Sequence, residues 1–355
     1  MNRTKGNKTA LHRILSAASV ILGLLFAVLL TGTVYAEYLL SKVNYVDPDA
    51  TTPTLSQEQM EAFENETETM DPDFSGPELN EEDIVLETTP QVDVSSENVV
   101  NILLIGNDRR ANEVARSDSM ILCTFNKHTN TITLTSFMRD MYVKIPGYRS
   151  NRINASYYFG GMNLLNKTLN YNFGIEFDGT VEIDFANFEK LIDLLGGIEL
   201  ELSAHEASYI NMESGSRLKA GVQLLTGEQA LWYSRFRKDA GGDFGRTNRQ
   251  RIVLSTLLNR YKDLSLTELM GMLDDILPMV TTNMTKDEII NHATNLFPML
   301  AGSEIVTQRI PEEGAYYQAR INDMAVLVPD IPENVKMLRK AMEEPEPIGF
   351  TGGVG

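Results

Sequence analysis

The residues with the greatest chemical potential are arginines that crowd into one short stretch of the chain. Six basic residues fall within seventeen positions: Arg235, Arg237, Lys238, Arg246, Arg249 and Arg251. Gly241, Gly242, Gly245 and Asp243 are among the residues that separate them. A guanidinium is planar and matches two phosphate oxygens at once, so several of them in one groove form a clamp for a pyrophosphate. Glycines let the backbone bend and approach a ligand closely. The stretch therefore predicts a phosphate-binding site, with a solvated charged surface as the alternative.

Carboxylates stand beside three apolar runs that predict neighbouring β-strands: 99–106, 120–126 and 131–139. Their short connections favour antiparallel pairing, which brings Asp108, Asp118, Arg139 and Asp140 to one edge of a sheet. One or two carboxylates together with substrate phosphates are the usual way in which Mg²⁺ is bound. On spacing alone, the simpler interpretation is that Asp108 and Asp118 are turn residues, because aspartate is common in loops.

The elements that must position these groups alternate along the chain. After the three strands, Asp184 is placed as the N-cap of a helix that Gly196 and Gly197 end, and 198–202 returns as a strand. Further helices are expected at 226–232, 247–261, 266–279, 286–300 and 332–342. Gln250 follows Thr247 by three residues, so a capping box would explain it without a ligand. This order predicts a layered α/β or α+β domain over 98–342, followed by a frayed tail at 343–355.

The N-terminal part predicts attachment to a membrane. Residues 14–36 carry no charge over 23 positions, which is long enough to span a bilayer, and basic residues precede them. The positive-inside rule places 1–13 in the cytoplasm and the rest outside the cell membrane. A cleaved signal peptide is the alternative, but the apolar run exceeds the roughly 7–15 residues of a signal core. Residues 37–97 are predicted to form an acidic, disordered extracellular spacer, because 43–97 hold sixteen acidic residues and no Lys or Arg.

Composition excludes several other kinds of chemistry. The net charge is −18 and the domain is expected outside the cytoplasm, so nucleic acid is an implausible partner. Cys123 is the sole cysteine, which rules out an intrachain disulfide and a cysteine zinc site, and its apolar neighbours indicate a buried hydrophobe. The four histidines have no metal-ligand spacing.

At this point the chain resembles a known family, the LytR/CpsA/Psr cell-envelope proteins, over residues 98–342. Several separate motifs in the order typical of that family carry the resemblance: NILLIGNDR from Asn101, RSDSM from Arg116, Arg139-Asp140, RIN from Arg152, Gly196-Gly197, RFR from Arg235 and DFGRTNRQ from Asp243. The resemblance implies an α/β fold with a central mixed sheet, helices on both faces in three layers, and an apolar pocket for a polyprenyl chain.

The resemblance also implies an activity. Such an enzyme takes a glycopolymer, for example teichoic acid or capsule, from an undecaprenyl pyrophosphate carrier and joins it to peptidoglycan as a phosphodiester. By motif position Asp108 and Asp118 would hold Mg²⁺, with Mn²⁺ as an open alternative, and Asp243 would orient the arginines. The residues implied to contact the pyrophosphate are Arg139, Arg152, Arg235, Arg237, Arg246 and Gln250.

In the expected mechanism, Mg²⁺ and the arginines neutralise the departing phosphate while a sugar hydroxyl attacks in line. Arg139, Arg237 and Asp243 belong to the catalytic set, and Asp108, Asp118 or Asp140 is the candidate base. Two alternatives remain. The same clamp could serve a hydrolase with water as the acceptor, or a non-catalytic binding module or regulator of the envelope.

Overall fold

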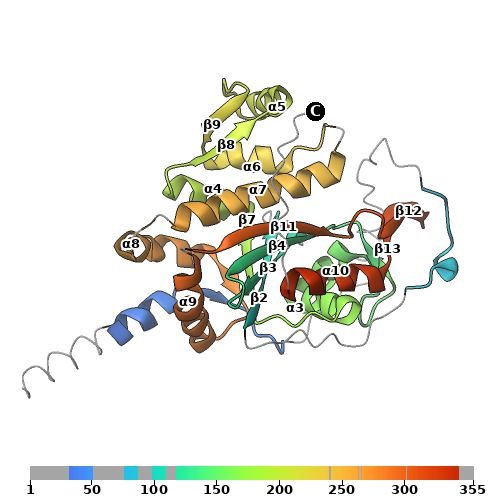
Figure 1. Ribbon diagram of the computed structural model, residues 1–355, viewed down its shortest axis with the longest axis horizontal. Helices are drawn as coiled ribbons and strands as arrows, with labels where there is room; N and C mark the ends of the chain where they lie inside the picture. The colour runs from blue at the N-terminus through green and yellow to red at the C-terminus, as the bar shows by residue number, and fades with distance from the viewer. Residues whose placement is uncertain are drawn as a thin grey trace, which may run out of the picture.

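A mixed β-sheet forms the centre of the computed structural model (Figure 1). The structure describes residues 32–50, 76–86, 98–108, 117–239, 241–262, 264, 266–300 and 302–343. Within them the sheet has seven strands in the order β1 (Asn44–Tyr45), β10 (Thr281–Thr282), β7 (Gly179–Asp184), β2 (Val99–Asn107), β3 (Ser117–Asn126), β4 (Thr131–Phe137) and β11 (Glu304–Ile310). The pairs β2–β3 and β3–β4 are antiparallel, as predicted, whereas β7 runs parallel to β2 and β11 parallel to β4.

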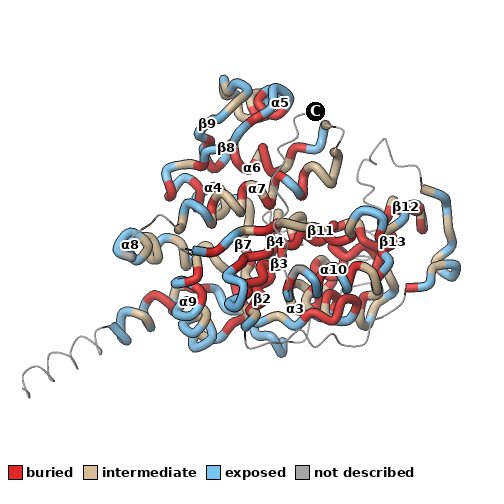
Figure 2. The backbone as a smooth tube through the Cα atoms, viewed as in Figure 1, coloured by how far each residue is buried: buried red, intermediate tan, exposed pale blue. Residues whose placement is uncertain are grey.

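Helices cover both faces of this sheet. Alternate residues of a strand point to opposite faces, and in β2 Leu103 packs under α3 (Ile153–Phe173) and α10 (Ile331–Glu343), while Ile102 packs under α7 (Gly242–Lys262) and α9 (Lys286–Leu300). Figure 2 shows the central strands β2, β3 and β4 buried along most of their length. The predicted central mixed sheet with helices on both faces is therefore confirmed.

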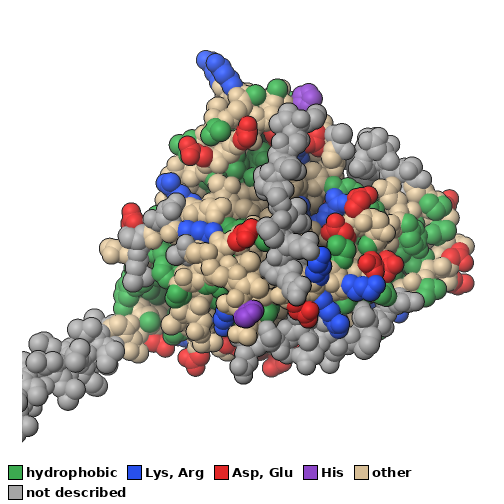
Figure 3. All heavy atoms as spheres, in the orientation of Figure 1, with side chains coloured by type: hydrophobic (Ala, Val, Ile, Leu, Met, Phe, Trp, Pro, Cys, Tyr) green, Lys and Arg blue, Asp and Glu red, His purple; other side chains and the backbone are tan. Residues whose placement is uncertain are grey.

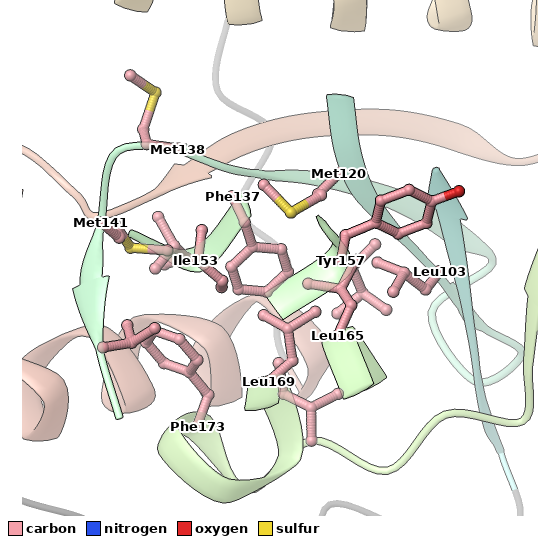
Figure 4. Close-up of a cluster of buried hydrophobic side chains, with 14 of the residues drawn as sticks. Leu103, Met120, Phe137, Met138, Met141, Ile153, Tyr157, Leu165, Leu169 and Phe173 are labelled. Carbon is pink, nitrogen blue, oxygen red and sulfur yellow. The ribbon is translucent and has the colours of Figure 1, made fainter. Parts of the chain in front are cut away.

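The layer under α3 is mainly apolar, although α3 also buries Asn154, Thr168 and Asn172. In Figure 4 the side chains of Phe137, Leu165, Leu169 and Phe173 point toward one another, and the rings of Phe137 and Phe173 are 5.6 Å apart. Both the strands and α3 contribute side chains to this layer, because a helix directs every third or fourth residue, and a strand every second residue, to the same face.

A further layer lies beyond α7. It consists of α4 (Phe185–Leu194), α5 (Ala204–Ser214), α6 (Gly227–Arg235) and the hairpin of β8 (Ile198–Leu202) and β9 (Gly221–Leu225). Its core includes Ile192 of α4 and Ile210 of α5, and Val253 of α7 packs into it. Helix α7 thus lies between the sheet and this outer layer (Figure 1).

Smaller elements complete the described structure. They are the 3-10 helices η1 (Glu81–Asp83) and η2 (Leu277–Met279), the hairpins of β5 (Tyr142–Val143) with β6 (Asn151–Arg152) and of β12 (Tyr316–Ile321) with β13 (Met324–Pro329), and α8 (Leu266–Ile276).

Two stretches of the predicted spacer pack against the domain. Strand β1 pairs in parallel with β10, and Glu78 forms a bridge with Arg320 of β12. The prediction of a disordered spacer over 37–97 is therefore wrong for 37–50 and 76–86. The local reason is apolar content within the acidic sequence: Leu39, Leu40, Val43 and Leu86 are each less than 8 % exposed. Burial of these side chains outweighs the charge repulsion that favours an extended chain.

No helix among the described residues is both long and apolar enough to cross a membrane. The span predicted at 14–36 overlaps them only at 32–36, and the cytoplasmic tail predicted at 1–13 lies outside them. The tail predicted at 343–355 overlaps them only at its first residue.

Gly227, the first residue of α6, is expected to tolerate no side chain. A Cβ there would collide with the backbone carbonyl of Glu189 in α4, and the Gly227 amide already donates to Asp193 Oδ1 at 2.7 Å. We expect Gly227→Ala to lower the free energy of unfolding by about 1–3 kcal/mol, because the backbone of α4 or α6 must move to make room for the methyl group. Urea denaturation would measure the loss. Gly271→Ala in α8 is the matched control, since its Cβ would meet open space and alanine favours a helix by roughly 0.5–1 kcal/mol. Equal stabilities for the two variants would contradict the prediction.

Candidate active site

The predicted carboxylates and arginines meet at the edge of the sheet where β2 ends and β3 begins. Asn107 is paired with Ser117 in the register of these strands, which puts Asp108 and Asp118 at the same edge. Arg139 follows β4, is 4 % exposed, and its Nη1 donates to Asp118 Oδ1 at 2.9 Å. The antiparallel pairing inferred from the short connections therefore brings these residue types together as predicted.

Asp243 joins the arginine-rich stretch to this edge. Its Oδ1 lies 2.8 Å from Arg246 Nη2, 3.6 Å from Arg139 Nε and 3.7 Å from Arg237 Nε. Three guanidiniums, from the segment after β4, from the segment after α6 and from α7, thus surround one carboxylate that is only 17 % exposed. A like-charge cluster of this kind is held together by the central anion.

Helix α7 begins earlier than the sequence predicted. It starts at Gly242, so Thr247 lies within the helix and donates back to the carbonyl of Asp243 at 3.1 Å. The expectation that Thr247 and Gln250 form a capping box is therefore wrong. The glycines at 241, 242 and 245 obscured the helix start, because glycine is a weak helix former. The additional turn carries Asp243 and Arg246, and Gln250 faces a cavity instead.

That cavity has a volume of about 240 Å³. Its lining includes Asp118 together with Arg235, Arg237, Arg246 and Gln250, as well as Phe185, Tyr209, Trp232 and Ser234. Of the residues predicted to contact a pyrophosphate, these three arginines and Gln250 thus share one wall. The aromatic residues were not predicted, and nothing in the sequence marked them as part of a polar site.

Arg235 is held by aromatic rings. Its guanidinium carbon lies 5.2 Å from the centre of the Phe185 ring and 5.3 Å from that of Trp232. Cation–π contacts of this kind fix a guanidinium without a carboxylate that would neutralise it. Arg235 therefore presents its charge to the cavity.

Arg246 is the most deeply buried of the cluster, at 1 % exposure. Its Nε and Nη1 donate no hydrogen bond within the described residues, and Nη1 is 3.9 Å from Asp118 Oδ1. Burial, and next the charge of Arg139, lower the pKa of Arg246 to about 10. Buried donors normally find acceptors, so the unsatisfied donors of Arg246 indicate a site for an anion.

The carboxylates of the cluster are held in the ionised form. Burial by itself raises the pKa of Asp118 and of Asp243, but the surrounding guanidiniums outweigh it, and both pKa values lie below the usual range. Among the guanidiniums, Arg139 lowers the pKa of Asp118 most, and Arg246 lowers the pKa of Asp243 most.

The donor set suits a hard divalent cation. Asp118 offers anionic oxygen at the cavity wall, and Asp108, which is partly buried, follows β2 at the same edge of the sheet. No group of three or more His, Cys, Asp or Glu that could hold a metal occurs among the described residues. Mg²⁺ typically uses one or two carboxylates and completes its shell with phosphate and water, so this pair is compatible with it.

Arg152 and Asp140 connect to the cavity indirectly, through Arg139 and then Asp118. Arg152 Nη1 donates to Asp140 Oδ1 at 3.4 Å, and Asp140 Oδ2 is 3.6 Å from Arg139 Nε. Neither residue is part of the cavity lining. The structure thus connects Arg152 to the cluster through Asp140 and Arg139, and direct contact of Arg152 with a pyrophosphate stays a prediction.

Arg249 and Cys123 have structural surroundings. Arg249 Nε donates to Glu206 Oε1 at 2.6 Å, and its Nη2 pairs with Asp239. The carboxylates of α5 and of the loop before α7 therefore neutralise the charge of Arg249.

Cys123 is buried in the sheet, and burial raises the pKa of its thiol to about 12. The prediction that Cys123 is a buried hydrophobe is confirmed.

Comparison with known proteins agrees with the family resemblance seen in the sequence motifs. A model of the LytR_cpsA_psr family matches residues 60–343, so the match begins within the predicted spacer. Over 229 residues the chain is 33 % identical to a Bacillus cereus protein named polyisoprenyl-teichoic acid–peptidoglycan teichoic acid transferase TagU, with 64 % of this chain and 73 % of that protein aligned.

Solved structures share the fold. One is described as TagT bound to LIIa-WTA, with a TM-score of 0.58, 27 % identity, and coverage of 70 % of this chain and 91 % of that chain. Another is described as the LytR-CPS2A-psr family protein YwtF (TagT) with bound octaprenyl pyrophosphate lipid, with a TM-score of 0.55, 25 % identity, and coverage of 70 % and 90 %.

Proposed function

The chain belongs to the LytR_cpsA_psr family, and we propose that it transfers a glycopolymer from a polyprenyl pyrophosphate carrier to peptidoglycan, forming a phosphodiester. The observation that carries this proposal is the cavity walled by Arg235, Arg237 and Arg246 with the carboxylate of Asp118 beside them. The names of the relatives point the same way, because one is a teichoic acid transferase and another was solved with octaprenyl pyrophosphate.

In this proposal the arginines bind the two phosphates and stabilise the charge that develops on the leaving group. Donors fixed before the reaction need no reorganisation as charge develops, and they act strongly where water is excluded. Arg246 supplies unsatisfied, buried donors, and the aromatic contacts of Arg235 hold its position. Asp243 keeps Arg139, Arg237 and Arg246 converged at distances of 2.8–3.7 Å.

Asp108 and Asp118 are the residues that would hold Mg²⁺ in this proposal. The ion would neutralise the departing lipid phosphate as a Lewis acid. Asp118 is a weak base, since the arginines keep its pKa below the usual value, and a catalytic base works best with a pKa near the operating pH. This leaves Asp108 or Asp140 as the residue that accepts the proton from the incoming sugar hydroxyl.

The apolar layer under α3 is the proposed place for the polyprenyl chain. It adjoins the arginine cluster, because Phe137 and Met138 lie in it and Arg139 follows them directly. Methionine side chains adapt their shape to a flexible ligand, and Met120, Met141 and Met162 also belong to this layer. Binding of the chain there would hold the head group at the reacting residues.

We further propose that residues 14–36 anchor the protein in the cell membrane, with 1–13 in the cytoplasm and the domain outside. The support is the uncharged stretch with basic residues before it. This placement puts the cavity on the same side as peptidoglycan.

The test uses the full-length chain with a polyprenyl pyrophosphate oligosaccharide, a peptidoglycan oligomer and Mg²⁺, with products identified by mass spectrometry. We expect a phosphodiester-linked sugar on the peptidoglycan. Free phosphorylated sugar as the only product would establish a hydrolase instead, and tight carrier binding without any product would establish a binding module.

Removal of the metal is expected to abolish the transfer. With EDTA the two carboxylates lose the ion that offsets the pyrophosphate charge, and added Mg²⁺ restores product; a parallel addition of Mn²⁺ determines whether it substitutes. The control is carrier binding, which the arginines support without the metal. Full activity in EDTA would refute the metal assignment to Asp108 and Asp118.

A further inference from the structure

The chain just after the predicted anchor is built into the central sheet. Asn44, the first residue of β1, follows Ala36 by eight residues. Its amide donates to the carbonyl of Val280 at 3.1 Å, and the amide of Val46 donates to Thr282 at 2.8 Å. Eight residues reach at most ~28 Å even when fully extended. The edge of the sheet formed by β1 and β10 therefore lies within this distance of Ala36, where the predicted anchor ends.

Ion pairs connect the segment before β1 to two helices. Lys42 Nζ is 2.8 Å from Asp274 Oδ1 of α8, and Glu37 Oε2 is 2.6 Å from Lys286 Nζ of α9. Exposed ion pairs contribute little on their own, but Leu39 and Leu40 are buried alongside them at 5 % and 6 % exposure. The segment is thus held by backbone pairing, apolar burial and ion pairs together.

Exposed apolar side chains gather on these same elements. We call them the N-terminal apolar surface: Val34, Tyr35, Tyr38, Tyr45, Met270 of α8, and Ile290 and Phe297 of α9. Hydrophobic side chains show on the surface around α8 and α9, next to the helical residues 32–40 (Figures 1 and 3). Exposed apolar patches mark interaction sites, and tyrosine is enriched where proteins meet the head groups of a bilayer.

We infer that the N-terminal apolar surface rests on the lipid bilayer, so that the domain lies on the membrane in one fixed orientation and does not hang from a flexible spacer. This inference depends on the proposed anchor at 14–36. The bilayer is the occupant because the apolar stretch ends within this surface: Val34 and Tyr35 belong to both.

The charges on this surface indicate how the contact is made. Lys42 and Lys286 are each paired with a carboxylate, and Asp287 and Glu288 lie in the first turn of α9. A net acidic rim gains nothing from anionic lipids, unlike a polybasic patch. The contact therefore depends on apolar and aromatic burial, and we expect added salt not to weaken it.

The test measures the depth of single side chains in the bilayer. Cys123 is buried with a raised thiol pKa, so it is inert toward labelling and a new cysteine takes up the label alone. The full-length chain, placed in nanodiscs that contain phosphatidylglycerol and a lipid with a quencher in its upper acyl chain, carries a fluorophore at Ile290→Cys or Phe297→Cys. The matched controls are Leu224→Cys and Met212→Cys, which are 62 % and 63 % exposed in the outer layer.

We expect quenching at positions 290 and 297 to exceed that at 212 and 224 severalfold, at low and at high salt. The variant Ile290→Asp/Phe297→Asp, labelled at Tyr45→Cys, should lose most of the quenching there. Equal quenching at all four positions, with the protein retained in the nanodiscs, overturns the inference and leaves the anchor and the transferase intact. A chain that does not enter nanodiscs at all refutes the anchor and the inference with it, whereas transfer activity is assayed separately.

Discussion

Replacing Arg237 by alanine is expected to lower the rate of polymer transfer by about 10²–10³-fold, the usual effect of removing one preorganised donor from a charged transition state. Arg237 lines the cavity and its side chain is 40 % exposed, so it can reach a ligand without supporting the core. Asp243 keeps its ion pair with Arg246 at 2.8 Å in the variant. The fold should therefore survive, with an unchanged midpoint of urea denaturation.

The charge and the shape of Arg237 can be separated. Arg237→Lys keeps a cation but loses the bidentate fork, so we expect it to recover only part of the rate. Arg260→Ala, an exposed arginine near the far end of α7, is the matched control and should transfer at the wild-type rate. Equal rates for Arg237→Ala and Arg260→Ala, by mass spectrometry of the product, would remove Arg237 from the catalytic set.

The exchange Asp243→Asn is expected to lower the free energy of unfolding by about 3 kcal/mol, because it removes the partner of a buried charge. The amide has nearly the same shape, but it leaves the guanidiniums of Arg139, Arg237 and Arg246 facing one another around a neutral group. Transfer should fall as well, since the arginines no longer converge. Urea denaturation followed by the fluorescence of Trp232, the single tryptophan, would measure the loss, with the exposed Asp275→Asn as control.

The same carboxylate makes stability depend on pH in a defined direction. Because the pKa of Asp243 is lowered in the folded protein, its contribution is present above the unfolded-state pKa of about 3.9 and is lost as pH falls through the folded-state value. The wild-type protein should therefore lose more stability than Asp243→Asn between pH 5 and the acid limit of about 2. If the free energy of unfolding falls with pH in the same way for both proteins, Asp243 is not held ionised by the arginines.

Patterns of local contacts made much of this site predictable. Short connections between apolar runs implied antiparallel strands, and antiparallel pairing brought Asp118 and Arg139 within 2.9 Å. The last helix, expected at 332–342, is α10 at Ile331–Glu343. Both predictions depend on residues near each other in sequence, where periodicity is a direct signal.

Contacts between distant segments were not predictable in this way. Strand β11 pairs with β4 across more than 160 residues, and β1 joins a sheet whose other strands begin at Val99. Nothing in the local sequence of residues 44–45 distinguishes an edge strand from a polar linker. The aromatic wall of the cavity was missed for the same reason, because Phe185, Tyr209 and Trp232 come from three different helices.

The inclusion of β1 in the sheet has a consequence for any shortened form of this protein. A truncation that begins at residue 98 removes a strand, and the backbone of β10 that β1 now covers becomes an open edge. Unpaired edges recruit strands from other molecules, and the buried side chains of Leu39, Leu40 and Val43 leave an apolar hollow behind them. Self-association of such a fragment would therefore reflect the missing segment and not the native assembly of the full-length chain.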